Sequence, residues 1–79
     1  MKNAYTAMDI ENLKMIGSFF RGLRLEKGLS IEQLAEIANL NRNYLGEVER
    51  GERNISLINL IRLAKAHGLP LREIFPKNL

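Results

Sequence analysis

The sequence predicts an all-α fold of five helices in one compact domain. Apolar residues recur at intervals of three and four along most of the 79-residue chain, which is the spacing of a helix with one buried face. No segment alternates apolar and polar residues with the period of two that is typical of a half-buried strand. Residues that cap or end helices separate the apolar segments, so each helix can be placed in turn.

The first helix is expected to extend to Lys27. Thr6 or Asp9 could cap it, because either side chain can accept a hydrogen bond from a free N–H of the first turn. Gly17 and Gly22 lie inside this helix, where a glycine either weakens the helix or lets another helix approach closely; the sequence leaves both readings open. Its apolar stripe consists of Leu13, Ile16, Phe20 and Leu23.

The second and third helices are short and are joined by a tight turn. Ser30 and Gln33 form a capping box at the start of the second helix, in which each side chain satisfies a free backbone donor. Asn39 suits the turn, since asparagine tolerates the left-handed backbone conformation. Asn41 is a suitable cap for the third helix, which Gly51 ends.

Two further helices complete the fold. Ser56 caps a fourth helix that ends at His67, where a histidine is more often a stabiliser of the helix C-terminus than a base or a ligand. Pro70 fits the first turn of a short fifth helix, and Pro76 closes that helix.

Composition sets the broad class of the protein. Residues 1–8 are expected to be a flexible leader and residues 9–79 a single domain, since a chain of this length has no room for a second. The absence of cysteine excludes disulfides and thiolate metal sites and fits the cytoplasm. No segment resembles a signal peptide or a membrane span, so no membrane partner is expected. The net charge of +3 suits a polyanionic partner.

The third helix is the candidate DNA-recognition element, because two helices across a tight turn present the second helix to the major groove. On a helical wheel, Leu45 and Val48 define its buried side. Arginine binds guanine, asparagine binds adenine, and glycine allows close approach. Each such residue alone fits an ordinary solvated surface, but their combination favours base recognition. The side chains that lead or point outward are Arg42, Asn43, Gly46, Glu47 and Arg50.

The charges around this helix cancel. Three arginines and three glutamates lie between residues 41 and 54, so affinity should come from placed contacts and helix N-termini rather than a basic stripe. Glu49 lies about 70° from the buried centre of the wheel. A half-buried carboxylate needs a partner, and Arg24 on the first helix is the leading candidate for a structural ion pair.

The segments IGSFFRGLRLEKGLS, EQLAEIANLNRNYLGEVERGERN and SLINLIRLAKAHGLPLREIF resemble, in this order, the Xre (Cro/CI-type) helix-turn-helix family. The resemblance covers residues 13–75 and implies a compact five-helix domain of the phage-repressor type. Within the family, LNRNYLGEVERGERNISL is most similar to controller proteins of restriction-modification systems. These commonly carry a tyrosine after the first two recognition residues, and an aliphatic residue where Ile55 stands here.

The resemblance also implies the site residues. Base contacts fall to Arg42 and Asn43, with Tyr44 and Gly46 near the groove, and the Arg24–Glu49 ion pair is implied as well. Ile31 departs from the glutamine that often begins the second helix, and this removes one expected polar contact. Backbone contacts are expected from Ser30, Gln33, Arg50, Arg53 and Asn54.

The fourth and fifth helices carry more apolar surface than one core requires, because the fourth is apolar nearly all round. We therefore expect a symmetric homodimer, although a fourth helix enclosed in a five-helix core is the alternative. A two-fold dimer places its recognition helices about 34 Å apart and favours a palindromic operator. The expected interface consists of Ile58, Ile61, Leu71, Ile74 and Phe75.

These features predict a transcriptional regulator that binds a double-stranded DNA operator and controls restriction-modification genes. Glu47 and Glu52 are the candidate residues for contact with RNA polymerase. An antitoxin or phage-type repressor is a second possibility, and a helical protein-interaction module a third. No enzyme and no cofactor are expected, since the chain has no nucleophilic pair, metal-ligand spacing or glycine-rich phosphate loop.

Overall fold

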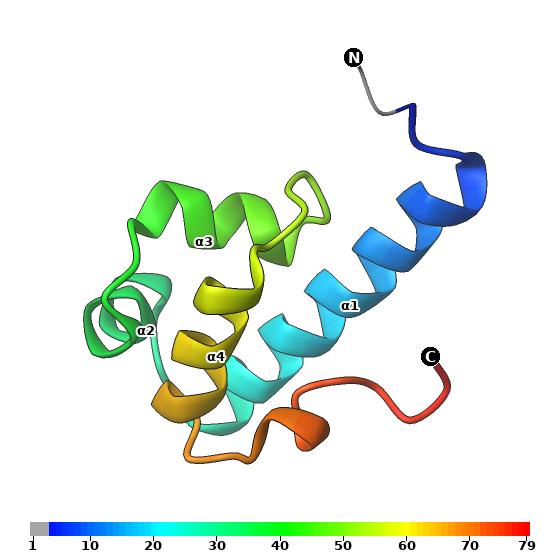
Figure 1. Cartoon of the computed structure of the whole chain (residues 1–79). Helices are drawn as coiled ribbons and strands as arrows, with labels where there is room; N and C mark the ends of the chain where they lie inside the picture. Colours follow the sequence, from blue (N-terminus) through cyan, green and yellow to red (C-terminus); the bar gives the residue numbers. More distant parts are fainter. Residues whose placement is uncertain (1–3) are drawn as a thin grey trace.

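The computed structural model describes residues 4–79, which form four α-helices and one 3-10 turn around a single core (Figure 1). No strand occurs in this range, so the all-α prediction is confirmed for it. Helix α1 runs diagonally across the molecule, and its N-terminal end extends beyond the other helices (Figure 1). The elements are α1 (Ala7–Glu26), α2 (Ile31–Ala38), α3 (Arg42–Glu49), α4 (Leu57–Ala66) and the 3-10 turn η1 (Leu71–Glu73).

The prediction of a fifth α-helix is wrong. Only the 3-10 turn η1 forms there, with hydrogen bonds from Glu73 N to Pro70 O at 2.9 Å and from Ile74 N to Leu71 O at 3.1 Å. The segment is too short for more, because Pro70 precedes the turn and Pro76 disfavours a helical conformation in the residue before it. These i to i+3 bonds are the tighter pattern that such short segments adopt.

Helix α1 begins earlier than the predicted leader allows. Thr6 Oγ1 accepts a hydrogen bond from Asp9 N at 3.0 Å, and the Asp9 carboxylate accepts one from Thr6 N at 2.9 Å. Both alternative caps therefore act together in one capping box. Because Ala7 and Met8 are already helical, these two residues are not part of a flexible leader; residues 1–3 of the predicted leader lie outside the described part of the chain.

The helix-turn-helix forms as its local signals predict. Ser30 and Gln33 make the reciprocal capping box, with distances of 2.8 and 3.1 Å. Asn39 adopts the left-handed conformation, at φ 57° and ψ 48°, and so redirects the chain between α2 and α3. Asn41 then caps α3, its side-chain oxygen accepting hydrogen bonds from the backbone N–H groups of Asn43 and Tyr44.

One hydrophobic core joins all the elements. Helix α1 packs against α3, α2 packs against α3 and α4, and η1 packs against α4. Leu45 and Val48 hold α3 on this core, on the side that the helical wheel predicts. The largest fully buried side chains are Phe20, Leu34, Leu45, Leu63 and Ile74.

An ion pair fixes the end of α3 to α1. Arg24 Nε donates to Glu49 Oε2 at 2.9 Å, and its Nη2 donates to Oε1 at 2.9 Å. The remaining nitrogen, Nη1, donates to the Leu29 carbonyl at 2.9 Å, so the arginine also holds the segment that leads into α2. The hydrogen bond with Glu49 raises the pKa of Arg24 above its usual value. The two side chains are 11% and 4% exposed, and the pair is structural, as the sequence predicts.

Candidate nucleic-acid interface

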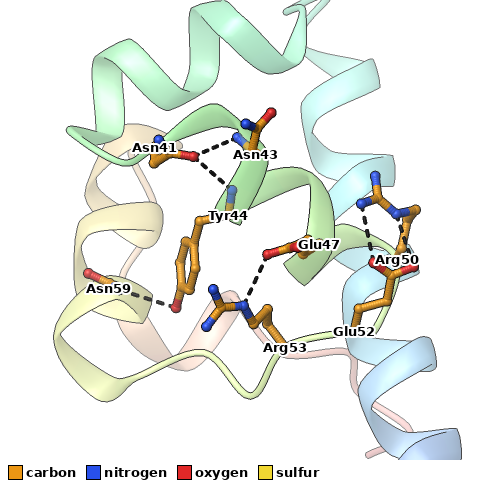
Figure 2. Close-up of polar contacts among 8 residues, drawn as sticks. All are labelled: Asn41, Asn43, Tyr44, Glu47, Arg50, Glu52, Arg53 and Asn59. Carbon is orange, nitrogen blue, oxygen red and sulfur yellow. Dashed lines mark hydrogen bonds and ion pairs between the residues drawn. The ribbon is translucent and has the colours of Figure 1, made fainter.

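The N-terminal end of α3 presents the two residues that the sequence singles out for base recognition. Arg42 and Asn43 are both exposed. The Asn41 cap fixes the backbone of this turn, and Figure 2 shows the Asn43 side chain directed away from Tyr44. A long cation and an amide thus stand side by side on a rigid helical turn, where each can reach the edge of a base.

Arg42 is paired in the free protein. Its Nη1 donates to Glu32 Oε2 on α2 at 3.1 Å, while 62% of the arginine side chain and 56% of the glutamate side chain remain exposed. The contact joins the two helices of the helix-turn-helix across its open face. An exposed pair of this kind contributes little to stability, so Arg42 is able to leave Glu32 for another partner.

Tyr44 belongs to a cluster that joins α3 to α4 and to the loop between them. Its hydroxyl accepts a hydrogen bond from Asn59 Nδ2 at 3.1 Å. The Arg53 guanidinium lies 5.2 Å from the centre of the tyrosine ring, and Arg53 Nε donates to Glu47 Oε1 at 3.0 Å (Figure 2). Tyr44 is therefore half-buried and held in place, unlike the two exposed residues before it.

The guanidinium of Arg50 lies close to Gly46. A Cβ atom at Gly46 would be 3.2 Å from Arg50 Nη1, so a side chain there would require the end of this arginine to shift slightly. Arg50 Nε and Nη2 donate to the two carboxylate oxygens of Glu52, at 3.1 and 3.2 Å (Figure 2). This hydrogen bonding raises the pKa of Arg50, which stays charged near neutral pH.

The predicted backbone-contacting residues lie on both sides of α3. Ser30 and Gln33 are exposed at the start of α2, and the side-chain oxygens of both are used in the capping box. The amide N–H groups of Gln33 remain free to donate to a phosphate. At the other end, exposed Asn54 donates through Nδ2 to the hydroxyl of Tyr5 at 3.3 Å.

An open groove of about 740 Å³ runs between α1, α2 and the outer face of α3. Four arginines and three glutamates line it, so its positive charge is largely compensated. Ile31 also lines the groove at the position where a glutamine is expected in the family, and it packs partly against the core. The charged lining residues are Arg21, Arg24, Arg42, Arg50, Glu32, Glu47 and Glu49.

Several of these residues escape sequence reasoning. Glu32 lies ten residues before its partner Arg42, and Tyr5 lies 49 residues before Asn54, so no helical periodicity connects either pair. Asn59 gives a weak signal only, as a polar interruption in an otherwise apolar helix. Such contacts are set by the crossing of helices, which the pattern along one helix does not encode.

The residues of the predicted dimer surface differ in exposure. Ile58 is 60% exposed and Leu71 is 37% exposed, while Ile61 and Phe75 are half-buried. The prediction that Ile74 belongs to the interface is wrong: this side chain is fully buried in the core, where a second copy of the chain cannot reach it. Leu57, which the prediction omits, is 64% exposed beside Ile58.

Metal and membrane sites do not emerge in the described chain. Residues 4–79 contain no group of three or more His, Cys, Asp or Glu side chains that could hold a metal ion. His67 ends α4, and both of its ring nitrogens are buried without a hydrogen-bond partner among the described residues; burial lowers its pKa. Its neutral ring therefore fills the core instead of stabilising the helix end through a positive charge. No helix within residues 4–79 has the length and apolar character needed to cross a membrane.

Comparison with known proteins places this geometry in a family. The helix-turn-helix family designated HTH_3 matches residues 20–74. The control protein C.SmaI of Serratia marcescens is 51% identical over 59 residues, covering 75% of this chain and 68% of the relative. The control protein C.BamHI of Bacillus amyloliquefaciens is 37% identical over 65 residues, covering 80% of each chain.

Solved structures agree with these sequence matches. The crystal structure of the restriction-modification controller protein C.AhdI from Aeromonas hydrophila has a TM-score of 0.80 and 48% identity, covering 82% of this chain and 98% of that one. The chain therefore belongs to the helix-turn-helix family of DNA-binding transcriptional regulators, and within that family it is similar to controller proteins of restriction-modification systems.

Proposed function

We propose that this protein binds a DNA operator as a symmetric dimer and regulates the expression of restriction-modification genes from the cytoplasm. The observation that carries the proposal is the exposure of Arg42 and Asn43 on a capped first turn of α3, braced by α2. The names of the similar control proteins support the restriction-modification setting.

In the proposed complex, α3 lies in the major groove and reads base edges. Arg42 leaves Glu32 and donates two hydrogen bonds to a guanine, and Asn43 pairs with an adenine. Gly46 adds no side chain between the helix and the groove. Tyr44 lies at the edge of the groove, and Asn59 holds the tyrosine hydroxyl by a hydrogen bond.

The flanking residues fix the register of α3 on the duplex through phosphate contacts, which carry no sequence information themselves. Ser30 and Gln33 act from the N-terminus of α2, where free backbone N–H groups favour an anion. The loop after α3 supplies Arg53 and Asn54, and Arg50 supplies a third contact at the end of the helix.

The dimer forms through the exposed part of α4 and the segment after it. Leu57, Ile58 and Leu71 leave apolar side chains in water, and a two-fold interface would bury them together with half-buried Ile61 and Phe75. Two copies of α3 then face half-sites about 34 Å apart, so the operator is palindromic. Sedimentation should show a dimer that Ile58→Glu converts to a monomer, whereas a monomer at high micromolar concentration of the unmodified protein would remove the dimer from the proposal.

RNA polymerase is proposed as a further partner of the DNA-bound protein. Glu47 and Glu52 lie at the end of α3 and in the following loop, where a neighbouring protein on the same DNA could reach them. Whether a bound dimer blocks or recruits polymerase depends on the position of the operator relative to the promoter.

In-vitro selection of bound duplexes from a random pool tests the operator proposal. We expect enrichment of a two-fold symmetric sequence, with guanine and adenine at positions that lose preference when Arg42 or Asn43 is replaced. Affinity for this sequence should fall steeply with salt, because phosphate contacts release counterions. A pool that remains unenriched after selection would contradict the proposal.

A further inference from the structure

Every arginine that the proposed function assigns to DNA is bound to a glutamate of the same chain. Arg42 pairs with Glu32 at 3.1 Å, and Arg53 pairs with Glu47 at 3.0 Å. Arg50 pairs with Glu52 at 3.1 Å. We infer that Glu32, Glu47 and Glu52, the competing glutamates, act as specificity determinants that withhold these arginines from DNA outside the operator. The inference rests on the proposed function.

The competing glutamates contribute little to the stability of the fold. All three pairs keep between 38% and 62% of each side chain exposed, so solvent screens them and they add little to stability. The Arg24–Glu49 pair, with 11% and 4% exposure, is the one that joins helices in the interior. The exposed pairs lie instead on the surface that would meet DNA, on both sides of α3.

The carboxylates lower the affinity of the three arginines for the phosphates of nonspecific DNA. A phosphate attracts a guanidinium by charge alone, with no geometric requirement, and this attraction dominates nonspecific binding. An arginine that already donates one or two charge-assisted hydrogen bonds to a carboxylate exchanges one anionic acceptor for another when it moves to a phosphate, so its net gain is small. The same carboxylate also repels the phosphate backbone that approaches it.

The operator provides base edges as hydrogen-bond acceptors in addition to phosphates. A guanine edge accepts two hydrogen bonds in a fixed geometry, which compensates Arg42 for leaving Glu32. Arg53 and Arg50 then exchange their carboxylates for phosphates whose positions the base contacts have already fixed. Nonoperator DNA supplies no such positioning, so the arginines stay on the glutamates and the complex is weak.

The chain provides a matched comparison for this inference. The test variant is Glu32→Gln, Glu47→Gln and Glu52→Gln together, which removes the three carboxylates and keeps similar side-chain size. The control variant is Glu11→Gln, Glu26→Gln and Glu73→Gln, at exposed positions that make no ion pair within residues 4–79. Both variants raise the net charge by three, so the comparison separates the loss of the three paired carboxylates around α3 from the change in net charge alone.

Binding to a nonoperator duplex over a range of salt concentrations distinguishes the two variants. Each freed arginine should steepen the slope of log affinity against log salt by about 0.9 in the test variant. At low salt its nonoperator affinity should exceed that of the control by on the order of tenfold, and the ratio of operator to nonoperator affinity should fall. Equal slopes and affinities in the two variants would overturn the inference.

Two further measurements keep the outcomes separate. Thermal melts should be similar for the unmodified protein and both variants, and the single variant Glu32→Gln repeats the comparison if the triple variant fails to fold. If selection yields an operator but the slopes are equal, the inference fails and the proposed function stands. If the slopes differ as expected but selection yields no operator, the proposed function fails and the specificity role fails with it; the glutamates then only weaken binding to DNA in general.

Discussion

Gly17 on α1 lies directly against the carbonyl group of Val48 on α3. A Cβ atom at Gly17 would be 2.4 Å from the Val48 oxygen and 2.6 Å from the carbonyl oxygen of Glu49. The two helices therefore approach each other through backbone at this point, which settles one of the two readings that the sequence leaves open for this glycine. The contact holds the buried side of α3 and so sets how far its outer face projects.

Gly17→Ala is expected to destabilise the fold. The new methyl group meets backbone atoms, which cannot move without shifting a helix, and overpacking of this kind costs about 1–3 kcal/mol. Gly22→Ala is the control, since a Cβ atom there has no neighbour within 4 Å. It should stabilise the protein by about 0.5–1 kcal/mol through the better helix propensity of alanine. Urea denaturation of both variants measures the difference, and a stabilised Gly17→Ala would contradict the close packing of α1 on α3.

Glu49→Ala is expected to lower stability before it affects DNA recognition. It leaves the guanidinium of Arg24 without its carboxylate in a site that is only 11% exposed to water. Removing one partner of a buried pair costs about 3 kcal/mol, the lower end of the usual range, because some exposure remains. Thermal or urea melts give the loss, and Glu52→Ala at an exposed position is the control with a small effect. Equal melts for the two variants would show that the Arg24–Glu49 pair does not hold α3.

Arg42→Ala should change which DNA sequence is bound. Loss of a bidentate contact to guanine costs about 1–3 kcal/mol of operator affinity and relaxes the preference at one base pair per half-site. The control is Arg72→Ala, which removes the same charge from η1, on the side of the molecule away from α3 (Figure 1). Binding measured against single-base variants of the selected operator provides the test; unchanged selectivity in Arg42→Ala would assign base reading to other residues.

Arg53→Ala is expected to behave differently from Arg42→Ala. Its proposed partner is a phosphate, so affinity should fall by a similar factor for the operator and for its single-base variants. The slope of log operator affinity against log salt should become shallower by about one. A change of base preference without a change of slope would place Arg53 at a base edge instead.

The parts of the fold that the sequence predicts well are those set by neighbouring residues. The caps at Thr6, Ser30, Asn41 and Ser56 each use a side chain and a backbone group two or three residues apart, so local sequence specifies them. The left-handed turn at Asn39 is local in the same way. The buried side of α3 also follows from its own periodicity. Glu49 lies near that side and therefore needs a partner, which is how the Arg24–Glu49 pair is predicted.

Other features depend on packing that no single segment encodes. Ile74 is apolar in a short segment, and only the position of η1 against α4 decides that it is a core residue and not part of a dimer surface. The Glu32–Arg42 and Tyr5–Asn54 contacts depend on the helix-crossing geometry in the same way. In the candidate site, sequence reasoning therefore finds the arginines but not their partners.

Acidification should destabilise the protein through His67. Burial lowers its pKa, and nearby Lys27 lowers it further, while Glu49 has a smaller opposing effect. The unfolded chain therefore binds a proton more readily than the folded protein does. Stability is complete above the ordinary histidine pKa of 6.5 and falls as the pH drops through this value toward the lower pKa of the folded state.

Melting temperatures measured between pH 7.5 and 5.5 test this dependence, in a range where carboxylates keep their charge. His67 is the only histidine in the chain, so His67→Leu should make the melting temperature nearly independent of pH over this range. The leucine also avoids burying the two ring nitrogens that lack hydrogen-bond partners, so the variant need not lose stability at neutral pH. An equal decline in the two proteins would show that protonation of another group causes it, because the variant has no imidazole to protonate.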